Sequence, residues 1–285
     1  MGGERDLPRI IFYGSGSMAR ALARMAVESG FEVAFYDRDP SRAEEAVREV
    51  GGGRLIDLAS AYPGSLVIVA TPGSEAGSAI SGMAKLDRPP LAVSDIATFK
   101  LGLINAYEKL PRSTRACSMH PLFGPRARLK EAHWVALVEL PGRREDCHWL
   151  ATIIDRMGLR YFQVDPETHD ELVGLTIGTS YTLGVAIAHR AKGLGVSPGL
   201  LEKHMGTTYR LLHLLSEAVA SDPPHLVEEI IGNSYTRKAI ERLIESIERV
   251  LRDPAGALEG QVNRGCRDPY GALYEVVEGV IARHC

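Results

Sequence analysis

A glycine-rich turn near the N terminus constrains the fold of this chain more than any other feature of its sequence. The turn GSGSMA begins at Gly14, follows the apolar run Arg9–Tyr13 and precedes a segment with helical periodicity at residues 19–29. Gly14 permits a tight turn, Gly16 lets the backbone approach a pyrophosphate, and Ala19 is small enough for helix and strand to pack closely. The N–H groups at the helix start then face the phosphates. This arrangement predicts a Rossmann-type domain that binds a nicotinamide dinucleotide.

An acidic residue after the second predicted strand bears on the choice of cofactor. Asp37 follows residues 32–36 and lies about 20 residues beyond the turn, where a carboxylate accepts hydrogen bonds from ribose hydroxyls. Because a carboxylate repels a 2′-phosphate, Asp37 favours NAD, although Arg38 and Arg42 nearby leave NADP possible. A later strand ends in Ala-Thr-Pro at the same sheet edge. The predicted cofactor-binding residues are Gly14, Ser15, Gly16, Ser17, Met18, Asp37, Arg38, Ala70, Thr71 and Pro72.

The pattern of apolar residues divides the chain into two parts. Up to about Asp165, short apolar runs alternate with helical patterns, which is typical of a parallel sheet with crossover helices. Beyond Asp165 only helical periodicity remains. The predicted strands are residues 9–13, 32–36, 66–70, 91–94, 116–119, 134–138 and 161–164, with a helix at residues 40–50. We expect an α/β fold, a Rossmann-type, mostly parallel sheet domain at residues 1–166, followed by an all-α helical domain at residues 167–285 for substrate binding and dimerisation.

The helical part has two conspicuous apolar segments. The longest uncharged run, residues 172–188, contains glycines at positions 174, 178 and 184 that would let another helix approach closely. The run is at the short limit for a membrane span and holds several hydroxyl groups, so we expect a buried core helix or a dimer interface. A second helix has an apolar face formed by Ile240, Leu243, Ile244, Ile247, Val250 and Leu251.

Composition narrows the possible partners and the compartment. A net charge of −3 provides no electrostatic basis for binding nucleic acid or an anionic membrane. The N-terminal residues lack the apolar core of a signal peptide, and the four cysteines show no CxxC spacing, so we expect reduced thiols in a cytoplasmic protein. Cys147 and His148 are adjacent without a second pair, so no metal site is expected.

Two segments at the ends of predicted strands carry the residues best suited to chemistry. They are residues 94–100, SDIATFK, and residues 118–125, SMHPLFGP, and both should project toward the cofactor crevice. His120 is the candidate general base, because an imidazole titrates near neutral pH. Thr98 offers a hydroxyl that could orient this imidazole or bind a substrate hydroxyl.

With these motifs in order along most of its length, the chain resembles the prephenate/arogenate dehydrogenase family of tyrosine biosynthesis. The segment MHPLFGP resembles the family's histidine motif, DIATFK its Asp-x-x-Ser-x-Lys segment, and VDPETHDELVG its entry into the helical domain, while TTYRLL and VEEIIGNS resemble later helices. The resemblance implies an oxidative decarboxylation in which His120 accepts the proton of a ring hydroxyl, hydride passes to the nicotinamide, and carbon dioxide leaves. Thr98 would bond to the same hydroxyl or to the imidazole.

The chain departs from the family pattern where the substrate carboxylates should bind. Tyr181 stands where the family commonly has a histidine, and residues 216–218, before an Asp-Pro turn, lack the usual arginine. A dicarboxylate substrate needs cations, so Arg210 and Arg126 are the expected replacements, with Tyr181 as a hydrogen-bonding partner. Glu217 would favour the ammonium group of arogenate over the keto group of prephenate.

Two other functions fit parts of the sequence. One is a different two-domain NAD(P)-dependent reductase, such as an imine or 2-hydroxyacid reductase, which would not need the histidine motif. The other is a non-catalytic NAD-binding sensor or scaffold, which the missing arginine favours. For the enzyme we expect a small-molecule substrate, prephenate or arogenate, and a homodimer formed through the helical domain.

Overall fold

A computed structural model describes residues 7–57, 63–128, 132–258 and 268–284. Contacts between residues divide the chain into two compact units, Met1–Asp170 and Glu171–Cys285. The boundary lies within one continuous helical segment, Pro166–Lys192, a few residues beyond the expected boundary at residue 166.

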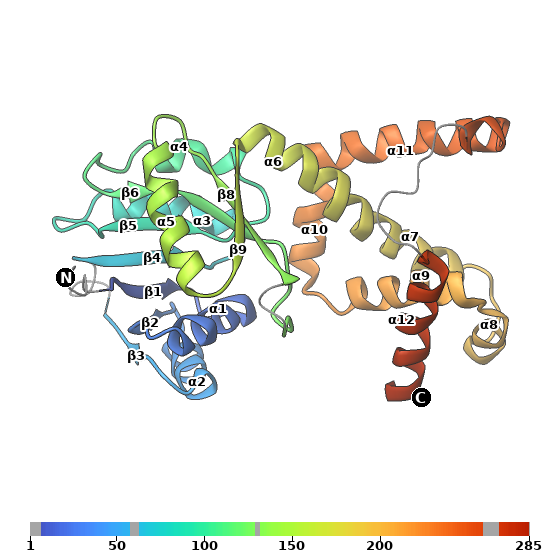
Figure 1. Cartoon of the computed structure of the whole chain (residues 1–285), viewed down its shortest axis with the longest axis horizontal. Helices are drawn as coiled ribbons and strands as arrows, with labels where there is room; N and C mark the ends of the chain where they lie inside the picture. The colour runs from blue at the N-terminus through green and yellow to red at the C-terminus, as the bar shows by residue number, and fades with distance from the viewer. Residues whose placement is uncertain (1–6, 58–62, 129–131, 259–267, 285) are drawn as a thin grey trace. The chain divides into compact units, whose positions relative to one another are not determined.

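A six-stranded parallel sheet forms the centre of the first unit, with the strand order β3-β2-β1-β4-β5-β6. This is the doubly wound order of a dinucleotide-binding domain, and it can be followed in Figure 1. It confirms the predicted fold class. The strands are β1 (Arg9–Tyr13), β2 (Val33–Tyr36), β3 (Arg54–Leu55), β4 (Ser65–Val69), β5 (Ala92–Asp95) and β6 (Arg115–Ala116).

Helices cover both faces of this sheet. Because successive side chains of a strand point to opposite faces, each face contributes to its own buried cluster. On β1, Ile10 and Phe12 pack in one buried cluster and Ile11 in the other. The first cluster receives α1 (Ser17–Glu28), α2 (Pro40–Val50) and α5 (Arg144–Arg156). The second receives α3 (Gly73–Met83) and α4 (Ile104–Tyr107). The sheet is therefore buried on both sides, as parallel sheets are.

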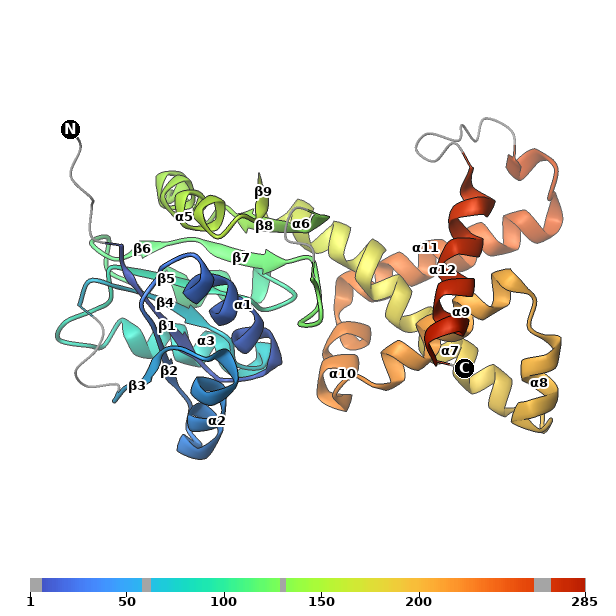
Figure 2. The ribbon, with the colours of Figure 1, turned by 60° about the horizontal axis from the view of Figure 1, so that its bottom comes forward.

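A second sheet of three strands departs from the predicted series. The strand expected at residues 116–119 is divided into β6 and β7 (Ser118–Pro121). β7 pairs antiparallel with β8 (Trp134–Val138), which runs parallel to β9 (Arg160–Val164). Figure 2 shows these strands together with α5 beside the main sheet. Periodicity alone could not detect the change of sheet, because a buried strand has the same pattern in either sheet.

Two of the cysteines are joined in a disulfide, so the expectation that they are reduced thiols is wrong. Cys117, between β6 and β7, and Cys147, in α5, are both buried and their Cα atoms are 5.1 Å apart. They are 30 residues apart in the sequence, and only the packing of α5 on the sheet brings them together. Cys266 and Cys285 lie outside the described residues.

The second unit contains helices and their connections and no strand among its described residues, as predicted. A π-helical turn, Gly174–Gly178, joins α6 (Pro166–Val173) to α7 (Thr179–Lys192). The other helices are α8 (Pro198–His204), α9 (Thr207–Ala220), α10 (Pro224–Gly232), α11 (Ser234–Arg252) and α12 (Pro269–His284).

The three glycines of the apolar run allow close packing within the chain, as their spacing predicted. A Cβ at Gly174 would lie 2.7 Å from the backbone of Tyr235 in α11, and one at Gly178 would overlap Thr236. A Cβ at Gly184 would lie 3.0 Å from Val219 in α9. These glycines are therefore used inside the unit, and they do not themselves indicate a second subunit.

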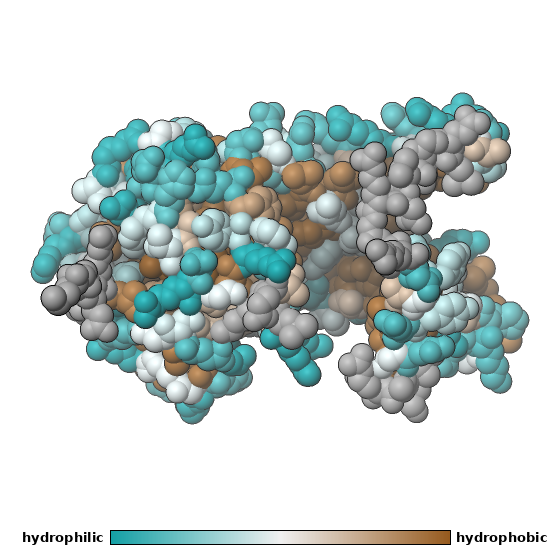
Figure 3. Space-filling view, in the orientation of Figure 1, coloured by the Kyte–Doolittle hydropathy of each residue, from teal (hydrophilic) through white to brown (hydrophobic). Residues whose placement is uncertain are grey.

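The apolar run itself is less buried than expected. Leu172, Leu175 and Val185 are exposed, Leu175 by 58%, and Figure 3 shows hydrophobic surface along α6 and α7. The alternative of a fully buried core helix is therefore wrong for the single chain. By length and composition alone, this is the one helix in the described part of the chain that would be able to span a membrane, which is weak evidence by itself.

Candidate functional site

The glycine-rich turn lies at the carboxyl end of β1, as predicted, and its first residue must be glycine. Gly14 has a φ of 105°, and a Cβ there would lie 2.7 Å from the carbonyl oxygen of Ala70, at the end of β4. A side chain would be strained by the backbone conformation and would collide with the neighbouring strand. Gly16 precedes α1 as its N-cap, so the first N–H groups of that helix are free to face an anion.

Asp37 is tied to the same turn. Its Oδ2 accepts hydrogen bonds from the backbone N–H of Ser15 at 2.9 Å and from the Ser15 hydroxyl at 2.6 Å. Burial raises the pKa of Asp37, but the hydrogen bonds from Ser15 and Asp39 outweigh this and hold its pKa below the usual 3.8. The group is thus a carboxylate at neutral pH, held where the phosphate-binding turn meets the end of β2.

The remaining predicted cofactor residues lie around this sheet edge with different partners. Arg38 extends to the surface and pairs with Glu75 at 3.2 Å, so its guanidinium is engaged and exposed. Pro72 is the N-cap of α3, so the N terminus of a second helix lies just after the end of β4. The hydroxyl of Thr71 is buried and has no hydrogen-bond partner among the described residues, so it is available to a ligand in this crevice.

His120 is buried near the end of β7, and its imidazole is held by a chain of contacts. Its Nδ1 lies 3.1 Å from Nε2 of His169 in α6, and Nδ1 of His169 lies 2.8 Å from Oδ1 of Asp170. Only 6% of His120 is exposed. Burial lowers the pKa of His120 well below 6.5, and the nearby charges of Lys100 and His169 lower it further. The imidazole is therefore neutral at physiological pH and able to accept a proton.

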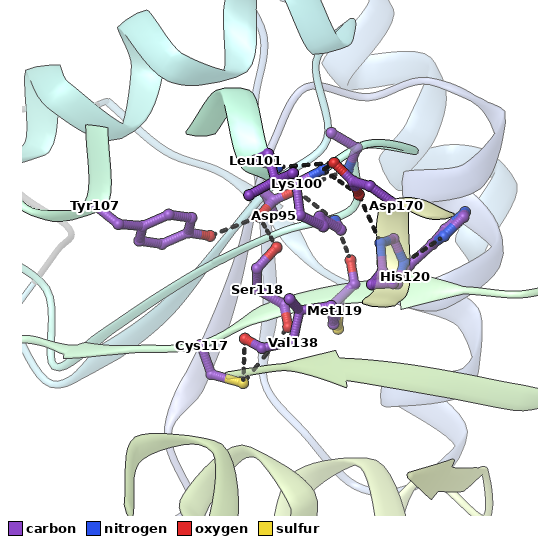
Figure 4. Close-up of polar contacts among 12 residues, drawn as sticks. Asp95, Lys100, Leu101, Tyr107, Cys117, Ser118, Met119, His120, Val138 and Asp170 are labelled. Atoms are coloured by element: carbon purple, nitrogen blue, oxygen red, sulfur yellow. Dashed lines mark hydrogen bonds and ion pairs between the residues drawn. The ribbon is translucent and has the colours of Figure 1, made fainter. Parts of the chain in front are cut away.

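A buried ion pair contacts the residues that precede this histidine in β7. Lys100, which follows β5, donates from Nζ to Oδ1 of Asp95 at 2.8 Å and to the carbonyl of Met119 at 2.7 Å. The other Asp95 oxygen accepts from the Tyr107 hydroxyl at 2.7 Å and from Ser118. Figure 4 shows the bonds from Lys100, Tyr107 and Ser118 meeting at Asp95. The segment before His120 is thus fixed by side chains from β5 and α4.

The contact of the imidazole that the structure shows is not with Thr98. Thr98 is partly exposed, two residues before Lys100, and the partner of the imidazole is His169 instead. Sequence reasoning placed His169, Asp170, Asp95 and Lys100 in motifs but assigned them no role. The adjacent His-Asp pair was the only available signal, and it did not reveal its distant partner.

The residues expected to bind substrate carboxylates belong to different units of the chain. Arg126 is exposed in the loop after β7. Within the helical unit, Arg210 donates to the carbonyls of Met205 and Glu202, and the Tyr181 hydroxyl donates to Asp222 at 2.6 Å. Burial and Asp222 raise the pKa of Tyr181, so it remains a phenol. The structure thus engages Arg210 and Tyr181 in contacts inside their own unit.

The fold and the candidate site resemble those of one class of protein, the Rossmann-type dinucleotide-dependent oxidoreductases with a helical second domain. Residues 9–97 match a family model described as "NADP oxidoreductase coenzyme F420-dependent". The match covers the segment from β1 to just beyond β5, and it supports a nicotinamide dinucleotide as the ligand of this domain.

Individual relatives narrow the class. The chain is 23% identical over 286 aligned residues to the 4-amino-4-deoxyprephenate dehydrogenase of Streptomyces pristinaespiralis, covering 96% of this chain and 91% of the relative. It is 22% identical over 225 residues to a probable arogenate/prephenate dehydrogenase of Methanocaldococcus jannaschii, covering 77% of this chain and 50% of that relative.

A solved structure shows the same fold over almost the whole chain. The prephenate dehydrogenase of A. aeolicus, in complex with hydroxyphenyl propionate and NAD+, matches with a TM-score of 0.74 at 17% identity, covering 98% of each chain. The comparisons therefore confirm the resemblance to prephenate and arogenate dehydrogenases that the motifs indicated.

Proposed function

We propose that this protein is an NAD(P)-dependent dehydrogenase that oxidatively decarboxylates prephenate, to 4-hydroxyphenylpyruvate, or arogenate, to tyrosine, with His120 as the base. The observation that carries the proposal is the buried, neutral imidazole of His120. The part of β7 just before it bonds to Asp95 and Lys100, at and after the carboxyl end of β5. β5 pairs with β4, and Ala70 at the end of β4 contacts the glycine-rich turn. Names of relatives that align over most of the chain support the substrate class.

The residues account for the proton in this reaction. His120 accepts the proton of the ring hydroxyl as the carbon–oxygen double bond forms, and returns it to the oxygen when the ring becomes aromatic. The carbon–hydrogen electron pair leaves as hydride, and the bond to the departing carboxylate supplies the electrons that aromatise the ring. When bound, the oxidised nicotinamide accepts the hydride. Thr98, partly exposed near this site, would hold the hydroxyl.

NAD is the cofactor that the turn favours. The Asp37 carboxylate lies at the ribose end of the predicted site, and its low pKa keeps it charged. Arg38 pairs with Glu75, which weakens its claim as a partner for a 2′-phosphate. The predicted residues of the turn, together with Ala70, Thr71 and Pro72, would bind the pyrophosphate and line the crevice.

The identity of the carboxylate-binding groups also belongs to the proposal. Arg126 is exposed and is the most available of the three predicted residues, whereas Arg210 and Tyr181 would exchange their present partners for substrate. A second candidate substrate is 4-amino-4-deoxyprephenate, named for the S. pristinaespiralis relative that aligns over 96% of this chain. With this substrate, a neutral imidazole would accept the proton of the amino group as the carbon–nitrogen double bond forms.

We further propose that the protein is a homodimer formed through the helical unit, with no nucleic-acid or membrane partner. Support comes from apolar side chains that the single chain leaves exposed on the π-helical turn Gly174–Gly178 and on α11, including Leu175, Ile247 and Leu251. Exposed apolar surface of this kind marks sites of association.

The test is the formation of reduced cofactor from NAD+ or NADP+ with prephenate, arogenate and 4-amino-4-deoxyprephenate. We expect turnover of at least one substrate and a loss of about 10²–10⁴-fold in kcat/KM in His120→Asn. His148→Asn, an exposed histidine on α5, is the matched control and should keep full activity.

Each alternative has its own outcome in this assay. Binding of NAD without turnover of any substrate would favour the sensor or scaffold, and turnover of imines or 2-hydroxyacids only would favour another reductase. Full activity in His120→Asn would remove His120 from the mechanism.

A further inference from the structure

The contacts behind His120 determine where its proton lies. The Asp170 carboxylate accepts from the backbone N–H of Lys100 at 2.9 Å and of Leu101 at 3.0 Å. Backbone N–H groups donate only, so both carboxylate oxygens act as acceptors. Figure 4 shows Asp170 at the centre of these bonds.

The third partner of this carboxylate fixes the tautomer of the next residue. Nδ1 of His169 lies 2.8 Å from Oδ1 of Asp170 and must donate to it. A neutral imidazole has one N–H, so Nε2 of His169 then carries a lone pair. That lone pair faces Nδ1 of His120 at 3.1 Å and requires a proton there.

The same reasoning defines the reactive atom of His120. With its proton on Nδ1, neutral His120 has its lone pair on Nε2, which has no hydrogen-bond partner among the described residues. The opposite assignment would need a protonated Asp170, whose O–H would have to donate to Nδ1 of His169 while the carboxyl group still accepts from the backbone N–H groups of Lys100 and Leu101. The network is therefore consistent in one direction only.

We propose that His169 and Asp170 are positioning residues that hold His120 in the tautomer with a free Nε2 and stabilise its charge after proton uptake. This inference rests on the proposed role of His120 as the base. When Nε2 takes the substrate proton, the Nδ1–H bond to His169 becomes charge-assisted and the Asp170 carboxylate offsets the new charge. The arrangement extends the Asp-His logic of the catalytic triad by one imidazole.

Charges on two sides of His120 act in opposite directions. Lys100, from the segment after β5, disfavours a protonated His120, although Asp95 partly neutralises it. Asp170, from α6, favours it through His169. Since burial and the charge of Lys100 keep the imidazole neutral before the reaction, the Asp170 side supplies the stabilisation needed during it.

The direct test is the tautomer of His120, read from long-range proton–nitrogen NMR spectra of the ¹⁵N-labelled protein and assigned with His120→Asn. We expect protonation at Nδ1 in the wild type. In Asp170→Asn, the side-chain NH₂ should donate to Nδ1 of His169, whose Nε2–H then donates to His120 and moves the His120 proton to Nε2. A wild-type proton on Nε2 would overturn the proposal.

Kinetics give a second readout. Asp170→Asn should lower kcat/KM by about 10²–10⁴-fold, mostly through kcat, with unchanged NAD+ affinity. Asp165→Asn is the matched control, because Asp165 accepts from the Thr168 N–H at the start of the same helix and asparagine caps as well as aspartate. An Asp170→Asn variant with an unchanged tautomer and activity within threefold of wild type would contradict the proposal.

A second pair of variants covers the case in which Asp170→Asn does not fold. The amide oxygen of Gln in His169→Gln can replace Nε2 as acceptor, whereas His169→Phe has no acceptor, so Gln should retain at least tenfold more activity than Phe. Equal activities in the two would overturn the proposal. Failure of the proposed function is distinguishable, because the wild type would then turn over no substrate while His120 still showed its proton on Nδ1.

Discussion

In the Met1–Asp170 unit charged side chains are buried and paired, whereas in the Glu171–Cys285 unit large apolar side chains are exposed. Lys100 is 1% exposed and bonds to Asp95 and a carbonyl. On α11, by contrast, Leu251 is 76% exposed. The first unit pairs its buried charges within one chain, whereas the second leaves apolar side chains exposed.

The comparison indicates that a single chain forms all the contacts of the buried charges, whereas the apolar surface of the second unit needs another surface to cover it. Buried charges are tolerated only where partners are already in place, so the network around His120 is preformed. Exposed apolar side chains gain free energy when a second surface covers them. We therefore expect substitutions in the first unit to act on folding and chemistry, and those on α11 to act on association.

The largest effect is expected from removing the buried cation. Lys100→Met leaves Asp95 charged and buried without its partner, so the free energy of unfolding should fall by about 3–5 kcal/mol. Urea denaturation measures this, with the exposed Lys109→Met as the control. A loss below about 1 kcal/mol would show that the network is not what holds the first unit together.

A smaller effect is expected on α11. The double substitution Ile247→Glu and Leu251→Glu places two charges on the exposed apolar face, and burying each side chain is worth about 1.5–3 kcal/mol. The dissociation constant of the dimer should rise by at least about 100-fold, measured by analytical ultracentrifugation. Arg242→Glu, a charged residue of the same helix, should leave it unchanged. A wild type that is monomeric at all concentrations would refute the interface.

The third prediction concerns the choice of cofactor. Asp37→Asn keeps a hydrogen-bond acceptor for Ser15 but removes the charge, so the KM for NAD+ should rise about tenfold while that for NADP+ falls. Steady-state kinetics with both cofactors measures the ratio. Asp39→Asn is the control, because Asp39 caps α2 through Ser41 and asparagine caps equally well. A ratio that Asp37→Asn leaves unchanged would mean that Asp37 does not select the cofactor.

The smallest effect is expected from pH. Burial, Lys100 and His169 lower the pKa of His120 below 6.5. As the pH falls through 6.5, the unfolded chain therefore binds a proton that the folded chain binds only at lower pH. Stability is therefore full above pH 6.5 and declines below it, by at most about 1.4 kcal/mol per pH unit. Denaturation at several pH values should show this component in the wild type but not in His120→Asn; equal slopes would contradict it.

Much of the first unit follows from local sequence. The run Arg9–Tyr13, the turn at Gly14 and the helix Pro40–Val50 were predicted at or near their observed bounds, because strand alternation, glycine and a capped helix start are short-range signals. The path of residues 116–121 was not predicted, since leaving one sheet for another depends on partners far along the chain.

The sequence by itself determined the class of fold, the phosphate-binding turn, the acidic residue after β2 and the histidine motif. Each depends on residues within one turn or on a regular period. The tertiary structure decided that Cys117 meets Cys147, that Lys100 is buried against Asp95, and that His169 and Asp170 hold the imidazole of His120. Cys117 and Cys147, and likewise His120 and His169, are distant in the chain. His169 and Asp170 are adjacent, and Asp95 and Lys100 are close in sequence, but their roles depend on the residues that surround them in the fold. Long-range packing sets such contacts, and no local pattern records it.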